Sequence, residues 1–177
     1  MTLQTDFDDY ANRWPDEIGV ACFASFLAQT PHAFEREHLA GHFTGSAWLV
    51  SADGARVLLT HHRKLNRWLQ LGGHADGDSD LAQVALREAE EESGLTDLQV
   101  EREPFDLDRH WIPARGNEPG HWHYDVRYVV RATGSEAFAI SEESLALAWK
   151  PISDMAGDSL AEESLRRMAN KWLSRGA

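Results

Sequence analysis

The chain has 177 residues, which is enough for a single domain that buries a substantial core without disulfides. Acidic residues outnumber basic ones by 29 to 17, and the net charge of −12 excludes general nucleic-acid binding, because phosphate backbones demand a basic surface. One cysteine excludes an internal disulfide framework and fits the reducing cytoplasm, and no stretch has the apolar length of a membrane helix.

Residues 1–41 are predicted to form an N-terminal helical extension packed on the core. Residues 1 to about 14 have the character of a polar lead and lack the apolar centre of a signal peptide. Pro15 is predicted to open a helix, because proline suits a first turn, and a second short helix is expected to end at Gly41. One face of the first helix carries Ile18, Cys22 and Phe26. A homodimer contact and a substrate lid are alternative roles for this extension.

From Gly45 the pattern changes to strands. The segments SAWLVS and ARVLLT flank Asp53 and Gly54, which predicts a hairpin with a compact turn. A basic loop follows, and its Arg63 and Lys64 stand out in a chain with so few cations. They either attract the phosphates of a substrate or simply keep the loop in solvent.

The stretch 73–95, GHADGDSDLAQVALREAEEESGL, organises the chain. Glycines and aspartates at its start favour a loop, Ser79 or Asp80 can cap a helix, and Gly94 can end it. On a helical wheel the side chains within about 60° of one direction include both apolar residues and carboxylates. These residues are Leu81, Val84, Glu88, Glu91, Glu92 and Leu95.

Three carboxylates that continue a buried face are unlike an ordinary solvated acidic face, which would lie opposite the apolar one. Glutamates at this spacing repel each other unless a cation lies between them, and oxygen ligands suit Mg²⁺ or Mn²⁺. The alternative is a charged surface helix with no ligand.

The whole stretch resembles the Nudix box. Gly73 matches its first glycine, and Arg87 to Leu95 match its second half, including Glu88, Glu91 and Glu92. One position departs from the pattern, because Ser79 stands where the family has a glutamate that steadies the arginine. Asp78 or Asp80 is a possible substitute.

The resemblance implies a fold, an activity and a cofactor. The fold would be α/β (α+β): a Nudix-like α/β/α sandwich with a mixed central sheet, over residues 42–177. Mg²⁺ or Mn²⁺ would be held by Glu88, Glu91, Glu92 and the Gly73 carbonyl, and Arg87 would orient a glutamate. The activity would be hydrolysis of a diphosphate bond in a nucleoside diphosphate linked to another group. Glu92 would act as base, or Glu143 would, because the family often adds a glutamate from outside the box.

Two segments after the box are predicted to pair as strands. Residues 98–112 form an extended run, 113–120 a turn-rich loop, and 121–131 a strand with strict alternation of apolar and polar side chains. One register places polar residues on a common face. It pairs Ile112 with His121, His110 with His123, Asp108 with Asp125, and Asp106 with Arg127.

This polar face is predicted to line a substrate pocket, and a solvated sheet face is the alternative. Substrate contacts are expected from His110, His123 and Arg127 on the strands and from His74 beside the box. Arg63 and Lys64 would add positive charge, and Trp68 or Trp111 would stack on a base. Leu160, Leu165, Met168 and Trp172 suggest a closing amphipathic helix.

Other functions are compatible with the same sequence. A non-catalytic nucleotide-binding or regulatory module is favoured by Ser79 and opposed by the retained carboxylates. An isomerase of isoprenoid diphosphates resembles another branch of the family, but that branch needs an active-site cysteine, and Cys22 lies far from the box in sequence.

Overall fold

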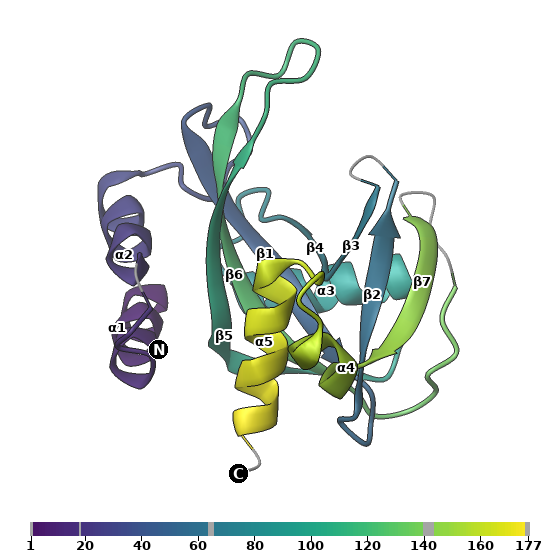
Figure 1. Cartoon of the computed structure of the whole chain (residues 1–177). Helices are drawn as coiled ribbons and strands as arrows, with labels where there is room; N and C mark the ends of the chain where they lie inside the picture. The colour runs from purple at the N-terminus through teal and green to yellow at the C-terminus, as the bar shows by residue number, and fades with distance from the viewer. Residues whose placement is uncertain (1, 18, 64–65, 140–143, 176–177) are drawn as a thin grey trace.

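The computed structural model describes residues 2–17, 19–63, 66–139 and 144–175. Its strands form one mixed sheet in the order β3-β2-β1-β6-β5, in which β4 also pairs with β1 and β7 with β2. Helices cover both sides of the sheet, which confirms the predicted α/β/α sandwich (Figure 1). The strands are β1 (Gly41–Val50), β2 (Arg56–His62), β3 (Arg67–Leu69), β4 (Leu71–His74), β5 (Leu98–Ile112), β6 (His121–Ala132) and β7 (Ser144–Pro151). The helices are α1 (Leu3–Arg13), α2 (Val20–Gln29), α3 (Leu81–Ser93), α4 (Ile152–Gly157) and α5 (Glu163–Ser174).

The N-terminal segment differs from the sequence prediction. The expected polar lead is helix α1, capped by the Thr2 side chain, with Phe7 and Tyr10 buried against the sheet. Aspartates at positions 6, 8 and 9 are interspersed with its short apolar stripe, so the helix is easily missed by composition. Pro15 lies in a turn instead of opening a helix, because α2 begins only after Gly19, whose φ of 108° ends the turn in the left-handed region.

Two further N-terminal predictions are affected. The predicted helix ending at Gly41 is wrong, because residues 31–40 form turns that lead directly into β1. Ile18 lies outside the described residues, whereas Phe26 on α2 stacks on Tyr124 of β6 with ring centroids 3.9 Å apart. In Figure 1, α2 lies above α1 at the left of the view, and the two helices flank β5 and β6.

Two apolar clusters occupy the two faces of the sheet. The first joins α1, α2 and α3 to one face through residues such as Phe7, Phe43 and Val84. The second joins α4 and α5 to the other face through Trp48, Phe105 and Met168. Because both faces are covered, polar side chains that alternate along β6 are buried as well.

Strand β6 pairs with a neighbour on each edge and so brings polar residues of several strands together. With β5 it is antiparallel, and the predicted register is confirmed at Asp106↔Arg127, Asp108↔Asp125, His110↔His123 and Ile112↔His121. With β1 it is parallel, which places His42 opposite His123 and Thr44 opposite Asp125. Strand β4 then adds to β1 and places His74 opposite Thr44.

The C-terminal segment closes the second apolar cluster. Helix α5 is the predicted amphipathic helix and buries Leu165 and Met168, whereas Leu160 precedes it and is 93% exposed. No helix among the described residues is long and apolar enough to cross a membrane.

Candidate active site on the α3 helix

Helix α3 begins and ends where its sequence signals indicate. The Asp80 side chain accepts a hydrogen bond from the backbone N–H of Gln83, and Gly94 ends the helix with a φ of 69°. The apolar side of α3 packs on β1 at Gly45, where a Cβ would lie 2.8 Å from the Leu81 carbonyl oxygen. The absent side chain of Gly45 therefore fixes how closely the helix approaches the sheet.

The carboxylates of α3 meet the glycines of β4. A Cβ on Gly73 would collide with the Glu88 carboxylate, and the backbone N–H of Gly72 donates a 2.9 Å hydrogen bond to Glu92 Oε1. Glu88 and Glu92 are half-buried and Glu91 is exposed. Glycine at position 73 thus leaves the space beside β4 that the Glu88 carboxylate occupies. Oxygen donors in that arrangement fit a hard divalent cation such as Mg²⁺ or Mn²⁺.

Arg87 contacts groups of the box while its side chain stays 36% exposed. Its guanidinium lies 3.5 Å from Glu88 Oε1, donates to the His74 carbonyl at 3.5 Å, and lies 3.9 Å from Asp78 Oδ2. Asp80 is engaged with Arg102 at 2.8 Å. Of the two aspartates offered as substitutes for the glutamate missing at Ser79, Asp78 is therefore the one beside Arg87.

Histidines from four strands gather next to Gly73. The ring of His42 lies 5.1 Å from that of His74 and 4.9 Å from that of His123, measured between centroids. His121 and His110 lie beside His123 at 5.1 Å and 5.4 Å. The predicted residues His74, His110 and His123 are thus brought together. His42 was missed by the sequence reasoning, which placed position 41 at a helix end, and only its alternation with Phe43 hints at a strand.

Burial controls the protonation of this group. It lowers the pKa of His42 to about 4, helped by the nearby His74 and His121, and lowers the pKa of His123 to about 2. The pKa of His74 is also lowered, first by burial and then by the positive charge of Arg36. These three rings are consequently neutral near pH 7.

Arg127 does not line an open pocket, and this corrects the sequence-based prediction. Its side chain is 3% exposed and donates to Asp125 at 2.8 Å and to Asp106 at 3.2 Å. Its Nη2 also lies 3.2 Å from Asp108 Oδ2. The alternation of β6 correctly placed Arg127 on the polar face, but α5 covers that part of the face. The guanidinium relieves the repulsion between Asp108 and Asp125.

The remaining predicted residues are not part of the histidine cluster. Trp68 stacks on His61, with ring centroids 5.2 Å apart, and Lys150 Nζ lies 4.6 Å from its centroid, so protein groups already contact the ring. Arg63 lies in an exposed turn after β2. Lys64 and Glu143 lie outside the described residues.

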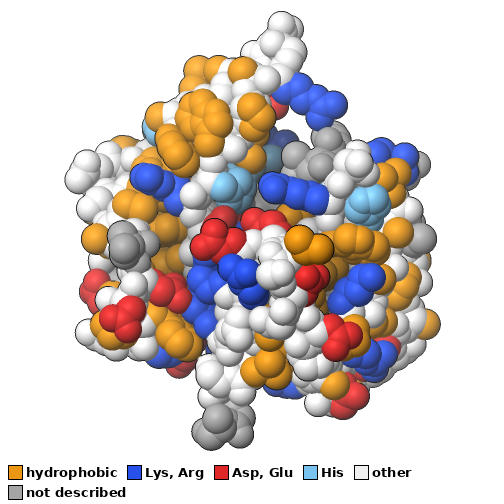
Figure 2. Space-filling model, viewed as in Figure 1, with side chains coloured by type: hydrophobic (Ala, Val, Ile, Leu, Met, Phe, Trp, Pro, Cys, Tyr) orange, Lys and Arg blue, Asp and Glu red, His pale blue; other side chains and the backbone are white. Residues whose placement is uncertain are grey.

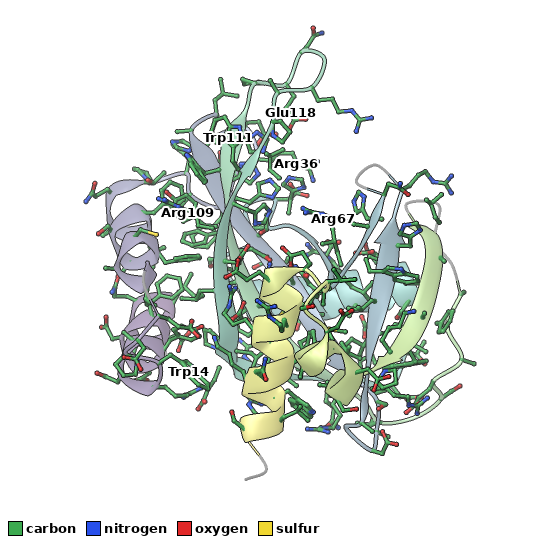
Figure 3. All side chains as sticks on the ribbon, in the orientation of Figure 1. Trp14, Arg36, Arg67, Arg109, Trp111 and Glu118 are labelled. Carbon is green, nitrogen blue, oxygen red and sulfur yellow. The ribbon has the colours of Figure 1, made fainter. Side chains whose placement is uncertain are left out.

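Charged groups surround the centre of the site. Figure 2 shows acidic and histidine side chains together near the middle of this face, with Lys and Arg side chains on both sides. In Figure 3, Arg36 and Arg67 lie near the centre of the view, between the β5–β6 hairpin and β3. Arg36 is held by two 2.5 Å hydrogen bonds to Asp76 in the box loop.

Cys22 is unsuited to catalysis at this site. It is partly buried on α2, which packs with the first apolar cluster, and burial raises the pKa of its thiol. A thiol with a raised pKa is a poor nucleophile.

Comparison with solved structures finds the same fold. A Nudix family hydrolase from Clostridium perfringens is 24% identical, with a TM-score of 0.59 over 77% of this chain and 98% of the other. An Ap4A hydrolase from C. elegans is 17% identical, with a TM-score of 0.56 over 75% and 96%. The NUDIX domain of Shewanella oneidensis NrtR, complexed with ADP ribose, is 23% identical, with a TM-score of 0.52 over 87% and 98%.

Comparison by sequence matches the chain to a family but to no individual curated protein. A family model, described as the NUDIX domain, matches residues 42–171. That match begins one residue into β1, ends within α5 and contains the loop and helix that carry the carboxylates. The chain therefore belongs to the Nudix domain family.

Proposed function

We propose that the protein hydrolyses the diphosphate bond of a nucleoside diphosphate linked to another group. The observation that carries the proposal is the contact between α3 and β4, where Glu88 lies against Gly73 and Glu92 accepts from Gly72. Carboxylates held against the glycines of β4 can bind the cation that phosphate hydrolysis requires. An acidic helix that merely faced solvent would not need this contact.

Mg²⁺ or Mn²⁺ is the proposed cofactor, held by Glu88, Glu91, Glu92 and the Gly73 carbonyl. The ion would neutralise phosphate charge and lower the pKa of a bound water. The residues of the chain would do the rest. Arg87 restrains Glu88 from a distance of 3.5 Å, and Glu92, fixed by the Gly72 N–H, is the proposed base. Glu143 is the alternative base, proposed from the family resemblance alone.

The substrate is proposed to enter between the box and the β5–β6 strands. His74, His110 and His123 would contact it from one side, and Arg63 and Lys64 would attract its phosphates. Trp111 is half exposed on β5 but lies on the face opposite His110, where its ring contacts Trp122. Trp68, whose ring Lys150 and His61 contact, is therefore the residue kept as the proposed partner for a base. The solved relatives named above carry Ap4A and ADP ribose in their descriptions, so both compound classes belong among the candidates.

A substrate panel with Mg²⁺ tests the proposal. It would include nucleoside triphosphates, nucleotide sugars, ADP-ribose, dinucleoside polyphosphates and capped RNA, with products identified. We expect Glu91→Gln and Glu92→Gln to reduce turnover of the best substrate by orders of magnitude and to preserve folding, because one fewer negative charge relieves repulsion along α3. Glu90→Gln, on the same helix outside the trio, is the matched control. A Glu92→Gln variant with full Mg²⁺-dependent turnover would refute the assignment.

A non-catalytic nucleotide-binding module is the second candidate. It is favoured by Ser79, since Arg87 has only a 3.9 Å approach to Asp78 where the family has a glutamate. Under this alternative the panel would give binding without products. We also infer a cytoplasmic protein from the single cysteine, and a homodimer through the N-terminal helices is proposed for test by light scattering.

A further inference from the structure

We propose that His42, His74 and His123 form a second metal site, separate from the carboxylates of α3, which takes a borderline divalent transition-metal ion such as Zn²⁺. Each histidine offers one ring nitrogen, and these three atoms all lie within 4.8 Å of one another. Ligands of a tetrahedral zinc ion lie roughly 3.3 Å apart, given Zn–N distances of about 2.0–2.1 Å. Small side-chain rotations would therefore close the three rings around one ion.

The strands set this convergence, so it is not a chance meeting of surface rings. His42 and His123 are direct partners in the parallel β1–β6 pairing. His74 arrives from β4, which pairs with the other edge of β1 and places His74 opposite Thr44. An ion bound there would join three strands at the point where β4 enters the Nudix box.

His42 is the second, independent observation. Its side chain is 1% exposed, and neither of its ring nitrogens has a partner at full hydrogen-bond geometry within the described part of the chain, although the His38 backbone lies near enough to favour a protonated ring. A buried polar group without a partner is costly, and each such group needs an explanation. A metal ion would supply the missing partner.

His121 lies where it could complete the coordination of the ion. Its Nδ1 donates a 3.0 Å hydrogen bond to the Pro119 carbonyl, so in the neutral ring the lone pair is on Nε2. That Nε2 lies 3.2 Å from Nε2 of His123. Histidines that bind zinc usually donate their other ring N–H to a carboxylate, a backbone carbonyl or a water. His121 is therefore the expected fourth ligand, or it orients a water in that position.

The donor type separates this site from the carboxylate site. Imidazole nitrogen suits Zn²⁺, Co²⁺ and Ni²⁺, whereas Mg²⁺ prefers oxygen and keeps several waters. The two sites should consequently load independently, and the histidine site does not require the protein to be a hydrolase.

Calorimetric titration of the metal-free full chain with Zn²⁺ tests the proposal, with excess Mg²⁺ present to occupy the carboxylates. We expect one Zn²⁺ per chain, and Co²⁺ should give the intense visible absorption of tetrahedral coordination. His74→Gln and His123→Gln should each raise the Kd for Zn²⁺ more than about 100-fold. That exceeds the roughly 10- to 100-fold effect of removing a group that only hydrogen-bonds to a metal ligand. His42→Asn should do the same, and the two less buried variants keep the test valid if it fails to fold.

The controls distinguish this site from other zinc binding. His32→Gln changes an exposed histidine outside the cluster and should leave the Kd unchanged. Glu91→Gln should also keep Zn²⁺ binding, whatever it does to turnover. Absence of Zn²⁺ binding by the natural chain, its retention in both His74→Gln and His123→Gln, or its loss in Glu91→Gln would each overturn the proposal.

Discussion

At the scale of single residues, Gly73 controls the distance between the sheet and α3. Its φ is not in the left-handed region, so alanine fits the backbone there, but an added Cβ would collide with the Glu88 carboxylate. We expect Gly73→Ala to displace Glu88 and to reduce Mg²⁺-dependent turnover by at least about tenfold, since misplaced catalytic groups cost rate steeply. Steady-state kinetics on the best panel substrate would measure this.

The control for Gly73 is Gly157→Ala. Gly157 ends α4, and a Cβ there would meet nothing within 4 Å. Its turnover should equal that of the natural chain. If Gly73→Ala and Gly157→Ala had equal turnover, moving the Glu88 carboxylate would have no effect on catalysis, and Glu88 would not be a ligand of the catalytic metal.

At the scale of elements, an ion cluster joins β5, β6 and α5. Asp106 is fully buried and accepts from Arg127 at 3.2 Å, Arg167 at 2.7 Å and Lys171 at 2.8 Å. Lys171 also reaches the N-terminal segment, at 2.5 Å from Glu17. The cluster therefore ties the closing helix and the N-terminal extension to the strands that carry the histidines.

Arg127→Ala should reduce the free energy of unfolding by about 3–5 kcal/mol, because it leaves buried carboxylates without their central cation. Urea denaturation would measure the loss. Arg102→Ala is the control, since that arginine is 63% exposed in its pair with Asp80 and its removal should cost less than about 1 kcal/mol. A stable Arg127→Ala protein with a lowered kcat/KM would instead return Arg127 to the substrate pocket.

At the scale of the whole molecule, the same carboxylates predict acid sensitivity. Burial alone would raise the pKa values of Asp106 and Asp108. Hydrogen bonds from Arg167 and the positive charges of Arg127 and Lys171 nevertheless lower the pKa of Asp106. A hydrogen bond from His110 and the positive charges of Arg127 and Arg167 lower the pKa of Asp108. The folded state then binds fewer protons than the unfolded state, whose Asp pKa is about 3.9.

The stabilisation should be fully present above about pH 5 and be lost as the pH falls through about 3.9 toward the lower folded values. Urea unfolding at about pH 5, 4 and 3 in metal-free buffer would show stability that rises with pH. Asp108→Asn should reduce that slope, by at most about 1.4 kcal/mol per pH unit for one group. An unchanged slope would mean that Asp108 ionises in the folded protein as it does in the unfolded chain.

The sequence by itself determined the features that depend on neighbouring residues. The loop, cap and glycine end of α3 are local signals, and the β5–β6 register follows from alternation across a short connection. For the same reason the Nudix resemblance could be read from the continuous stretch 73–95. The weak apolar stripe of α1 was missed, because its stability comes from burial of Phe7 and Tyr10 and not from its composition.

Only the tertiary structure decided what the polar face of β6 does. The parallel pairing with β1 joins residues about 80 positions apart, as in the hydrogen bond from Thr44 to Asp125, and no local pattern specifies it. That pairing brings His42 to His123, and the docking of α5 buries Arg127. Alternation assigns side chains to a face, but the elements that later cover the face determine which of them meet solvent, each other or a metal.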